Sequence, residues 1–130
     1  MTIATIKWKK QWIVVFIAFT LLFAFTPQAE AASRSVNLNW GQTIASTSAT
    51  YSNGGTNFKV TVYNHDTDYG FGYIDWYLKN DTTGAIAGFG TLAPGLSQTR
   101  WVSAKGAGNY RLYIKIHSDR FARATGTMAW

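Results

Sequence analysis

The chain has 130 residues and contains no cysteine and, after Glu30, no glutamate. The absence of cysteine excludes disulfide bonds and a thiol nucleophile, so side-chain packing alone must hold the fold together. Lysine is also scarce after residue 32, which leaves few strong helix-forming residues. Glycine, threonine, serine, asparagine and aromatic residues dominate instead, and this composition is typical of strands and turns.

Long apolar runs are lacking as well, apart from one near the start of the chain. Residues 12–25 are almost entirely apolar, and three lysines precede them. The run is shorter than the roughly 20 residues that a membrane-spanning helix needs, which argues against the alternative of a retained anchor. Residues 29–31 form a small A-x-A motif. We therefore predict a signal peptide over residues 1–31, cleaved after Ala31 or Ala32, and a secreted bacterial protein, Gram-positive by the length of the basic segment.

The remaining residues, 32–130, have the length of one domain with one core. They contain nine basic and five acidic residues, which gives a net charge of +4. They also contain 15 aromatic residues, each able to bury on the order of 150–250 Å². A cysteine-free domain of this size can therefore build a sufficient core.

Alternation of apolar and polar residues predicts short strands throughout this domain. In the clearest run, residues 110–117, the aliphatic side chains and Tyr110 point one way and the polar ones the other. Residues 43–51 form either an edge strand or a loop, and the glycine-rich residues 85–92 form a strand with a bulge. The other expected strands cover residues 33–40, 57–63, 71–79, 96–103 and 121–130. Seven or eight short strands with no helical period predict an all-β fold, a small antiparallel β-sandwich.

The run Gly106-x-Gly108-x-Tyr110-x-Leu112-x-Ile114, followed by a last strand, resembles the tail of the bacterial pre-peptidase C-terminal domains. Those domains are small β-sandwiches attached to secreted enzymes. The resemblance covers residues 106–130 and implies the same fold. The acidic calcium-binding positions of that family do not occur in the matching run, so the resemblance implies no metal site here.

Residue sets for catalysis and metal binding are few. The chain has no G-x-S-x-G motif, and its two histidines, His65 and His117, lie 52 residues apart. A Ser-His-Asp set built on them would lack a nucleophile elbow, and zinc would lack ligands. Residues 64–70 contain a D-x-D-x-G core, but no glutamate follows at the spacing of an EF-hand, so an Asx-turn loop is the simpler interpretation of this weak calcium candidate. We predict a protein that is not an enzyme and has no cofactor or metal.

The polar face of residues 110–117 is the strongest candidate site. It carries two cations, a phenol and an imidazole on a strand whose other face is aliphatic. If the last two strands pair, Arg123 joins this basic face. Basic patches attract polyanions, and exposed tyrosines can stack on sugars, although both are also ordinary features of a solvated sheet. The predicted binding residues are Arg111, Tyr113, Lys115, His117, Tyr63 and Tyr77.

These observations favour a secreted, non-enzymatic β-sandwich that binds an anionic cell-surface polymer or glycan, such as cell-wall glycan or teichoic acid. One alternative is an antibacterial protein that acts on anionic membranes, because the domain is small, basic and aromatic. A second is a matrix protein that associates with itself through the uncharged residues 43–50 and 85–90 at strand edges. A dedicated nucleic-acid role is not expected, since no module motif occurs.

Overall fold

A computed structural model describes residues 32–65 and 72–130, and within these ranges the backbone forms nine strands and no helix. The predicted signal peptide, residues 1–31, and the acidic centre of the 64–70 loop lie outside the described residues. In the described part of the chain, no helix is long and apolar enough to cross a membrane. The strands are β1 (Ser33–Leu38), β2 (Ile44–Ser46), β3 (Thr50–Ser52), β4 (Asn57–Asn64), β5 (Ile74–Asn80), β6 (Ile86–Leu92), β7 (Ser97–Ser103), β8 (Gly108–Ile116) and β9 (Ala124–Ala129).

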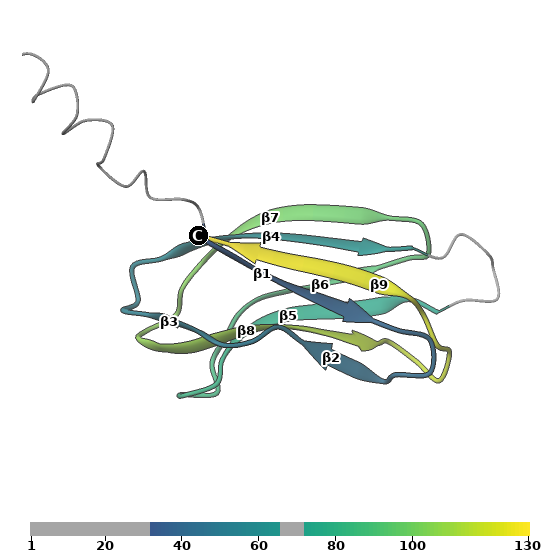
Figure 1. The fold of residues 1–130 in the computed structure, drawn as a ribbon, viewed down its shortest axis with the longest axis horizontal. Helices are drawn as coiled ribbons and strands as arrows, with labels where there is room; N and C mark the ends of the chain where they lie inside the picture. The colour runs from purple at the N-terminus through teal and green to yellow at the C-terminus, as the bar shows by residue number, and fades with distance from the viewer. Residues whose placement is uncertain (1–31, 66–71) are drawn as a thin grey trace, which may run out of the picture. The chain divides into compact units, whose positions relative to one another are not determined.

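The strands form two antiparallel sheets that pack face to face (Figure 1). Sheet A has the order β1-β9-β4-β7. Sheet B has the order β2-β8-β5-β6, and β3 also pairs with β8. The predicted all-β antiparallel sandwich is therefore confirmed, with nine strands where the sequence predicts seven or eight.

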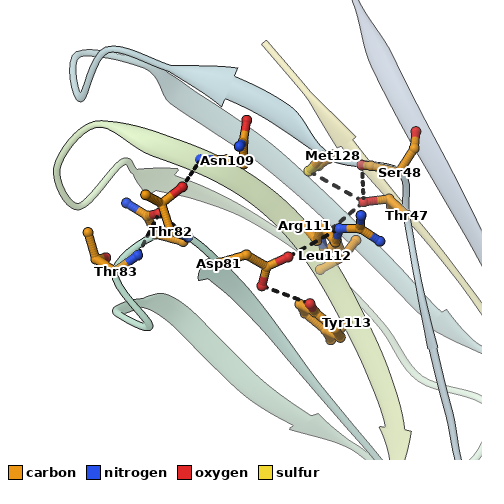
Figure 2. A network of polar contacts seen from close by, with 11 residues as sticks. Thr47, Ser48, Asp81, Thr82, Thr83, Asn109, Arg111, Leu112, Tyr113 and Met128 are labelled. Carbon is orange, nitrogen blue, oxygen red and sulfur yellow. Dashed lines mark hydrogen bonds and ion pairs between the residues drawn. The ribbon is translucent and has the colours of Figure 1, made fainter.

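The additional strand comes from residues 43–51, which contain the two short strands β2 and β3. Residues 47–49 separate them, and the first of these, Thr47, is buried. Its backbone N–H donates to the carbonyl of Leu112 at 3.0 Å, and its hydroxyl oxygen accepts from the N–H of Leu112 at 3.1 Å (Figure 2). A side-chain oxygen thus takes the place of a backbone carbonyl, so the edge of β8 stays paired between the two strands.

The core lies between the sheets and follows the predicted alternation. Phe58, Trp76 and Tyr110 are its largest buried side chains. The rings of Phe58, from sheet A, and Tyr110, from sheet B, have centroids 5.2 Å apart. Burial of each such side chain contributes about 1.5–3 kcal/mol, which explains how the fold manages without a disulfide.

The last two strands, β8 and β9, do not pair with each other. Arg123 would join Arg111 and Lys115 on one basic face only if these strands paired, so that part of the prediction is wrong. β8 belongs to sheet B and β9 to sheet A. Their apolar sides face each other across the core: a Cβ added at Gly126 would lie 2.8 Å from Cδ1 of Ile114. Both strands carry an apolar face that needs covering, and stacking them across the sandwich buries both faces at once.

Two glycines determine which residues of β6 face the core. A Cβ at Gly88 would lie 2.9 Å from Val102, and one at Gly90 would lie 2.5 Å from the indole nitrogen of Trp76. Both glycines therefore face inward, where no side chain fits, and Phe89 between them faces outward. The β5–β6 register also shifts at Leu78 and Lys79, which confirms the predicted bulge.

Candidate functional site

The outer face of sheet B gathers most of the predicted binding residues. Arg111, Tyr113 and Lys115 point outward from β8, while the residues between them are buried in the core. His117 follows the strand, and its backbone N–H donates to the carbonyl of Tyr73 at 2.9 Å. Because β5 pairs with β8 on one side and with β6 on the other, outward residues of three strands line up in rows.

The middle row is aromatic. Tyr77 of β5 is the register partner of Tyr113 in β8 and of Phe89 in β6. The rings of Tyr77 and Tyr113 stack with centroids 4.9 Å apart and planes 9° apart. Phe89 is 71% exposed. Phe89, Tyr77 and Tyr113 together are called the aromatic row below.

The row on one side of the aromatic row is polar and consists of Thr91, Asp75 and Lys115. The Thr91 hydroxyl donates to a carboxylate oxygen of Asp75 at 2.6 Å, and Nδ1 of His117 lies 2.9 Å from both of its oxygens. Burial opposes ionisation of Asp75, but these two hydrogen bonds, with the charges of His117 and Lys115, lower its pKa below the ordinary value. Asp75 is therefore a fixed anion at neutral pH.

On the other side of the aromatic row, Asp81 fixes two of the predicted residues (Figure 2). The Tyr113 hydroxyl donates to Oδ1 of Asp81 at 2.7 Å, and Nε of Arg111 lies 3.1 Å from Oδ2. Burial and the hydrogen bond to Asp81 raise the pKa of Tyr113 to about 12. Burial, with the charge of Asp81, also raises the pKa of Tyr77. Both phenols are therefore neutral, and their hydroxyls can form hydrogen bonds over a wide pH range.

A hollow of about 460 Å³ lies along this face. Ligand sites for small molecules are mostly apolar, contain a few polar groups and have volumes of roughly 300–1,000 Å³. The lining of this hollow likewise combines apolar and polar side chains. Its apolar lining includes Tyr77, Ile86 and Phe89, and its polar lining consists of Asp75, Lys79, Thr91 and Lys115.

The net charge of this face is small. Lys79, Arg111 and Lys115 supply three cations, while Asp75 and Asp81 supply two carboxylates. Arg111 is paired with Asp81, and Lys115 is the register partner of Asp75. The cations are thus interleaved with anions, so no strongly basic patch forms on this face.

The structure separates Tyr63 from the other predicted residues. Tyr63 lies on β4 in sheet A, with its ring edge-on to that of His65 at 4.3 Å between centroids. Tyr77 and the four predicted residues from 111 to 117 lie together on sheet B. The predicted set therefore divides between two sheets that expose opposite faces.

Phe89, Ile86 and Thr91 complete the site but were not among the predicted binding residues. The sequence places Ile86 and Phe89 among the apolar residues of a glycine-rich strand, without an outward role. The sequence signal for the outward position of Phe89 is the triplet of residues 88–90. Successive residues of a strand point to opposite faces, so Phe89 faces outward when the glycines on both sides of it face the core. The bulge then turns Ile86, which is 46% exposed, to the same outer face.

The polar residues of this face are not arranged for nucleophilic catalysis. Thr91 donates to Asp75, and so does His117, so the imidazole does not contact the hydroxyl that it would have to activate. Within residues 32–65 and 72–130, no group of three or more His, Cys, Asp or Glu residues is placed to hold a metal ion.

Comparison with known proteins shows the fold. The pre-peptidase C-terminal domain of a collagenase from Bacillus anthracis is 21% identical to this chain, with a TM-score of 0.50 over 75% of this chain and 86% of that domain. The K1 cleaved adhesin domain of Lys-gingipain from Porphyromonas gingivalis is 15% identical, with a TM-score of 0.48 over 67% of this chain and 62% of that domain. A carbohydrate-binding module from Cellvibrio mixtus lichenase 5A, solved with cellotriose, is 8% identical, with a TM-score of 0.47 over 81% of this chain and 90% of the module.

No protein-family model matches this chain, and neither does any curated protein sequence. The likeness to the collagenase domain confirms, for the fold, the resemblance that residues 106–130 show to the pre-peptidase C-terminal domains. At 21% identity it extends to the β-sandwich architecture and no further.

Proposed function

We propose that this chain is a secreted, non-enzymatic β-sandwich that binds a glycan of the bacterial cell surface through the outer face of sheet B. The observation that carries the proposal is the aromatic row, in register across three strands, with Tyr77 and Phe89 lining a hollow that also contains polar residues. A sugar ring offers an apolar face for stacking and hydroxyls at its rim for hydrogen bonds. The aromatic row supplies rings for stacking, and Asp75, Lys79 and Thr91 supply hydrogen-bonding groups for the hydroxyls.

The charge balance of this face supports one of the two polymers that the sequence leaves open. Teichoic acid is a polyanion, and its binding would need cations that are not already compensated. On this face Asp81 compensates Arg111, and Asp75 faces Lys115. A neutral cell-wall glycan therefore fits better, with the lysines acting as hydrogen-bond donors at the rim of the hollow.

The alternatives receive less support. Action on a membrane needs a large contiguous apolar surface, but the exposed large hydrophobic residues are divided between the two sheets, as Trp101 on β7 and Phe89 on β6 show. Self-association through β6 needs a free strand edge. The Arg100 side chain crosses from β7 and donates to the carbonyl of Phe89 at 2.9 Å, which blocks part of that edge.

The test is a pull-down of the purified protein on Gram-positive cell walls, with and without teichoic acid, at low and high salt. Binding that survives both removal of teichoic acid and high salt is the expected result. The double variant Phe89→Ala with Tyr77→Ala is expected to bind about tenfold or more weakly. Tyr51→Ala is the matched control, since Tyr51 is 68% exposed on β3 and is not part of the hollow.

Two results would contradict the proposal. Binding that disappears in high salt or without teichoic acid would favour a polyanion as the ligand. Equal losses in the Tyr51 control and in the double variant would show that the aromatic row is not the site. Dye release from anionic vesicles by micromolar protein would instead support the membrane alternative.

A further inference from the structure

We propose that the outer face of sheet A is a second binding surface, for a flat and uncharged polymer surface rich in hydroxyl groups. This face lies on the opposite side of the sandwich from the aromatic row. One domain could then hold two polymer strands or layers at once. This bridging role rests on the function proposed above, whereas the second surface itself is argued from sheet A alone.

The first observation is a row of hydroxyl groups that crosses the whole sheet. Ser35 is the register partner of Thr127, Thr127 of Thr61, and Thr61 of Thr99, so each strand of sheet A contributes one hydroxyl. Neighbouring strands lie about 4.8 Å apart, so the hydroxyls repeat at about that spacing. The Ser35 and Thr127 oxygens are 3.4 Å apart, and those of Thr61 and Thr99 are 3.3 Å apart, so the row is ordered.

The second observation is the near absence of charge. The outward positions of β1, β9, β4 and β7 carry hydroxyl, amide, methyl and aromatic side chains, and Lys59 is the one charged residue among these outward positions of the four strands. The domain as a whole is basic, with nine cations and five acidic residues after residue 31. An uncharged face on such a domain matches an uncharged partner. A polyanion would find little to bind here.

The third observation is the placement of two aromatic rings beside the hydroxyl row. Trp101 on β7 is 69% exposed, and Nζ of Lys59 lies 6.0 Å from its ring centroid. Tyr63 lies four residues from Lys59 along β4, about 13 Å away at the rise of a strand. Trp101 and Tyr63 thus lie on opposite sides of the hydroxyl row. Their separation is longer than one sugar ring, so the two aromatic side chains suit separate rings of an extended polysaccharide rather than one small ligand.

These three features together select the occupant. A protein partner would need a larger apolar patch than one indole and one phenol. A flat polysaccharide needs stacking surfaces, hydroxyl partners and no strong charge, and sheet A offers all three. The Tyr63 side chain, which the sequence places in the same site as Tyr77, then belongs to this second surface.

The experiment measures adsorption of the purified protein to cellulose powder, chitin powder and cell walls freed of teichoic acid. Three variants are compared with the wild type. The first removes the aromatic row (Phe89→Ala with Tyr77→Ala). The second removes the sheet A surface (Trp101→Ala with Thr61→Val and Thr127→Val), where valine keeps the shape of threonine and removes its hydroxyl. The third combines both sets of substitutions.

The proposal expects the first variant to retain adsorption to at least one polymer and the third to lose it by about tenfold or more. It also expects the wild type to clump suspended wall fragments, measured as turbidity, while each single-face variant adsorbs without clumping. Far-UV circular dichroism checks that every variant is folded. Tyr51→Ala serves again as the control for loss of an exposed ring.

Three results would overturn the second surface. In the first, the sheet A variant adsorbs and clumps like the wild type. In the second, the aromatic-row variant has already lost all adsorption to every polymer. In the third, the sheet A variant changes the sedimentation coefficient, which would identify a second copy of the chain as the occupant. If only the sheet A variant loses adsorption, the second surface stands and the function proposed for sheet B fails, so the two failures are distinguishable.

Discussion

The rings of Tyr77 and Tyr113 stack on neighbouring strands, with centroids 4.9 Å apart and planes inclined by only 9°. The pair is held from one end, because the Tyr113 hydroxyl donates to Asp81 at 2.7 Å. Asp81 also pairs with Arg111 at 3.1 Å, so one carboxylate orients two side chains of the site (Figure 2). A surface fixed before binding loses less side-chain entropy when a ligand arrives.

Asp81→Ala is therefore expected to weaken glycan binding severalfold, because Tyr113 and Arg111 lose their shared partner. The free energy of unfolding is expected to change by less than about 1 kcal/mol, since the pair is partly exposed. Titration calorimetry and urea denaturation measure the two effects. Asp119→Ala removes an exposed carboxylate elsewhere. An equal loss of affinity in that control would assign the effect to net charge.

The raised pKa of Tyr113 predicts a late step in an alkaline titration. An ordinary tyrosine ionises near pH 10, whereas Tyr113 is expected to ionise at about pH 12. The stability that this shift contributes is fully present below pH 10 and is lost as the pH rises through 12. Tyrosinate absorbance in the wild type and in Tyr113→Phe measures the step. The same late step in the variant would contradict the assignment.

The lowered pKa of Asp75 predicts a loss of stability in acid. Its pKa in the folded protein lies below the ordinary value of 3.8, so its contribution to stability is present above that pH and is lost as the pH falls through the folded pKa. Asp75→Asn is expected to show a shallower loss of stability as the pH falls below the ordinary value of 3.8. Tryptophan fluorescence during acid unfolding measures this. Identical profiles for the two proteins would contradict the role given to Thr91 and His117.

Asn80→Ala is expected to destabilise the fold by about 2–4 kcal/mol. Asn80 is fully buried at the end of β5. Its oxygen accepts from the backbone of Thr82 at 3.0 Å, and its nitrogen donates to the Ala107 carbonyl at 3.1 Å, so its loss leaves buried groups without partners. Asn53→Ala removes one exposed hydrogen bond, to Gly55, and is expected to cost less than about 1 kcal/mol. Thermal unfolding compares the two variants, and equal costs would contradict the prediction.

Gly90→Ala is expected to destabilise the protein by about 1–3 kcal/mol, because the new methyl group would lie 2.5 Å from the indole nitrogen of Trp76. It is also expected to weaken glycan binding, since β6 carries Phe89. Gly55→Ala is the control, because its Cβ would meet only the Asn53 side chain at 3.4 Å. Urea denaturation and the wall pull-down measure both effects. Unchanged stability in Gly90→Ala would mean that the inward packing of β6 is looser than described.

Much of the fold could be predicted from the sequence, because strand alternation is a local property. The inward residues of β4, β5 and β8 were predicted by their period of two, and the bulge of β6 by its glycines. The split of residues 43–51 into β2 and β3 was not, because it depends on Thr47 meeting Leu112, which lies 65 residues away.

Which residues form the site could be learned in full only from the tertiary structure. The sequence by itself determined that Arg111, Tyr113 and Lys115 share one side of a strand, since neighbours at spacing two always do. Only the fold decided that Phe89 and Tyr77 join Tyr113 in one row, because register between strands depends on long-range pairing. The fold also moved Tyr63 to the opposite sheet and separated β9 from β8. Local alternation records which side chains are buried, but the choice of partner strand follows from covering every apolar face in three dimensions, and no short stretch of sequence contains that information.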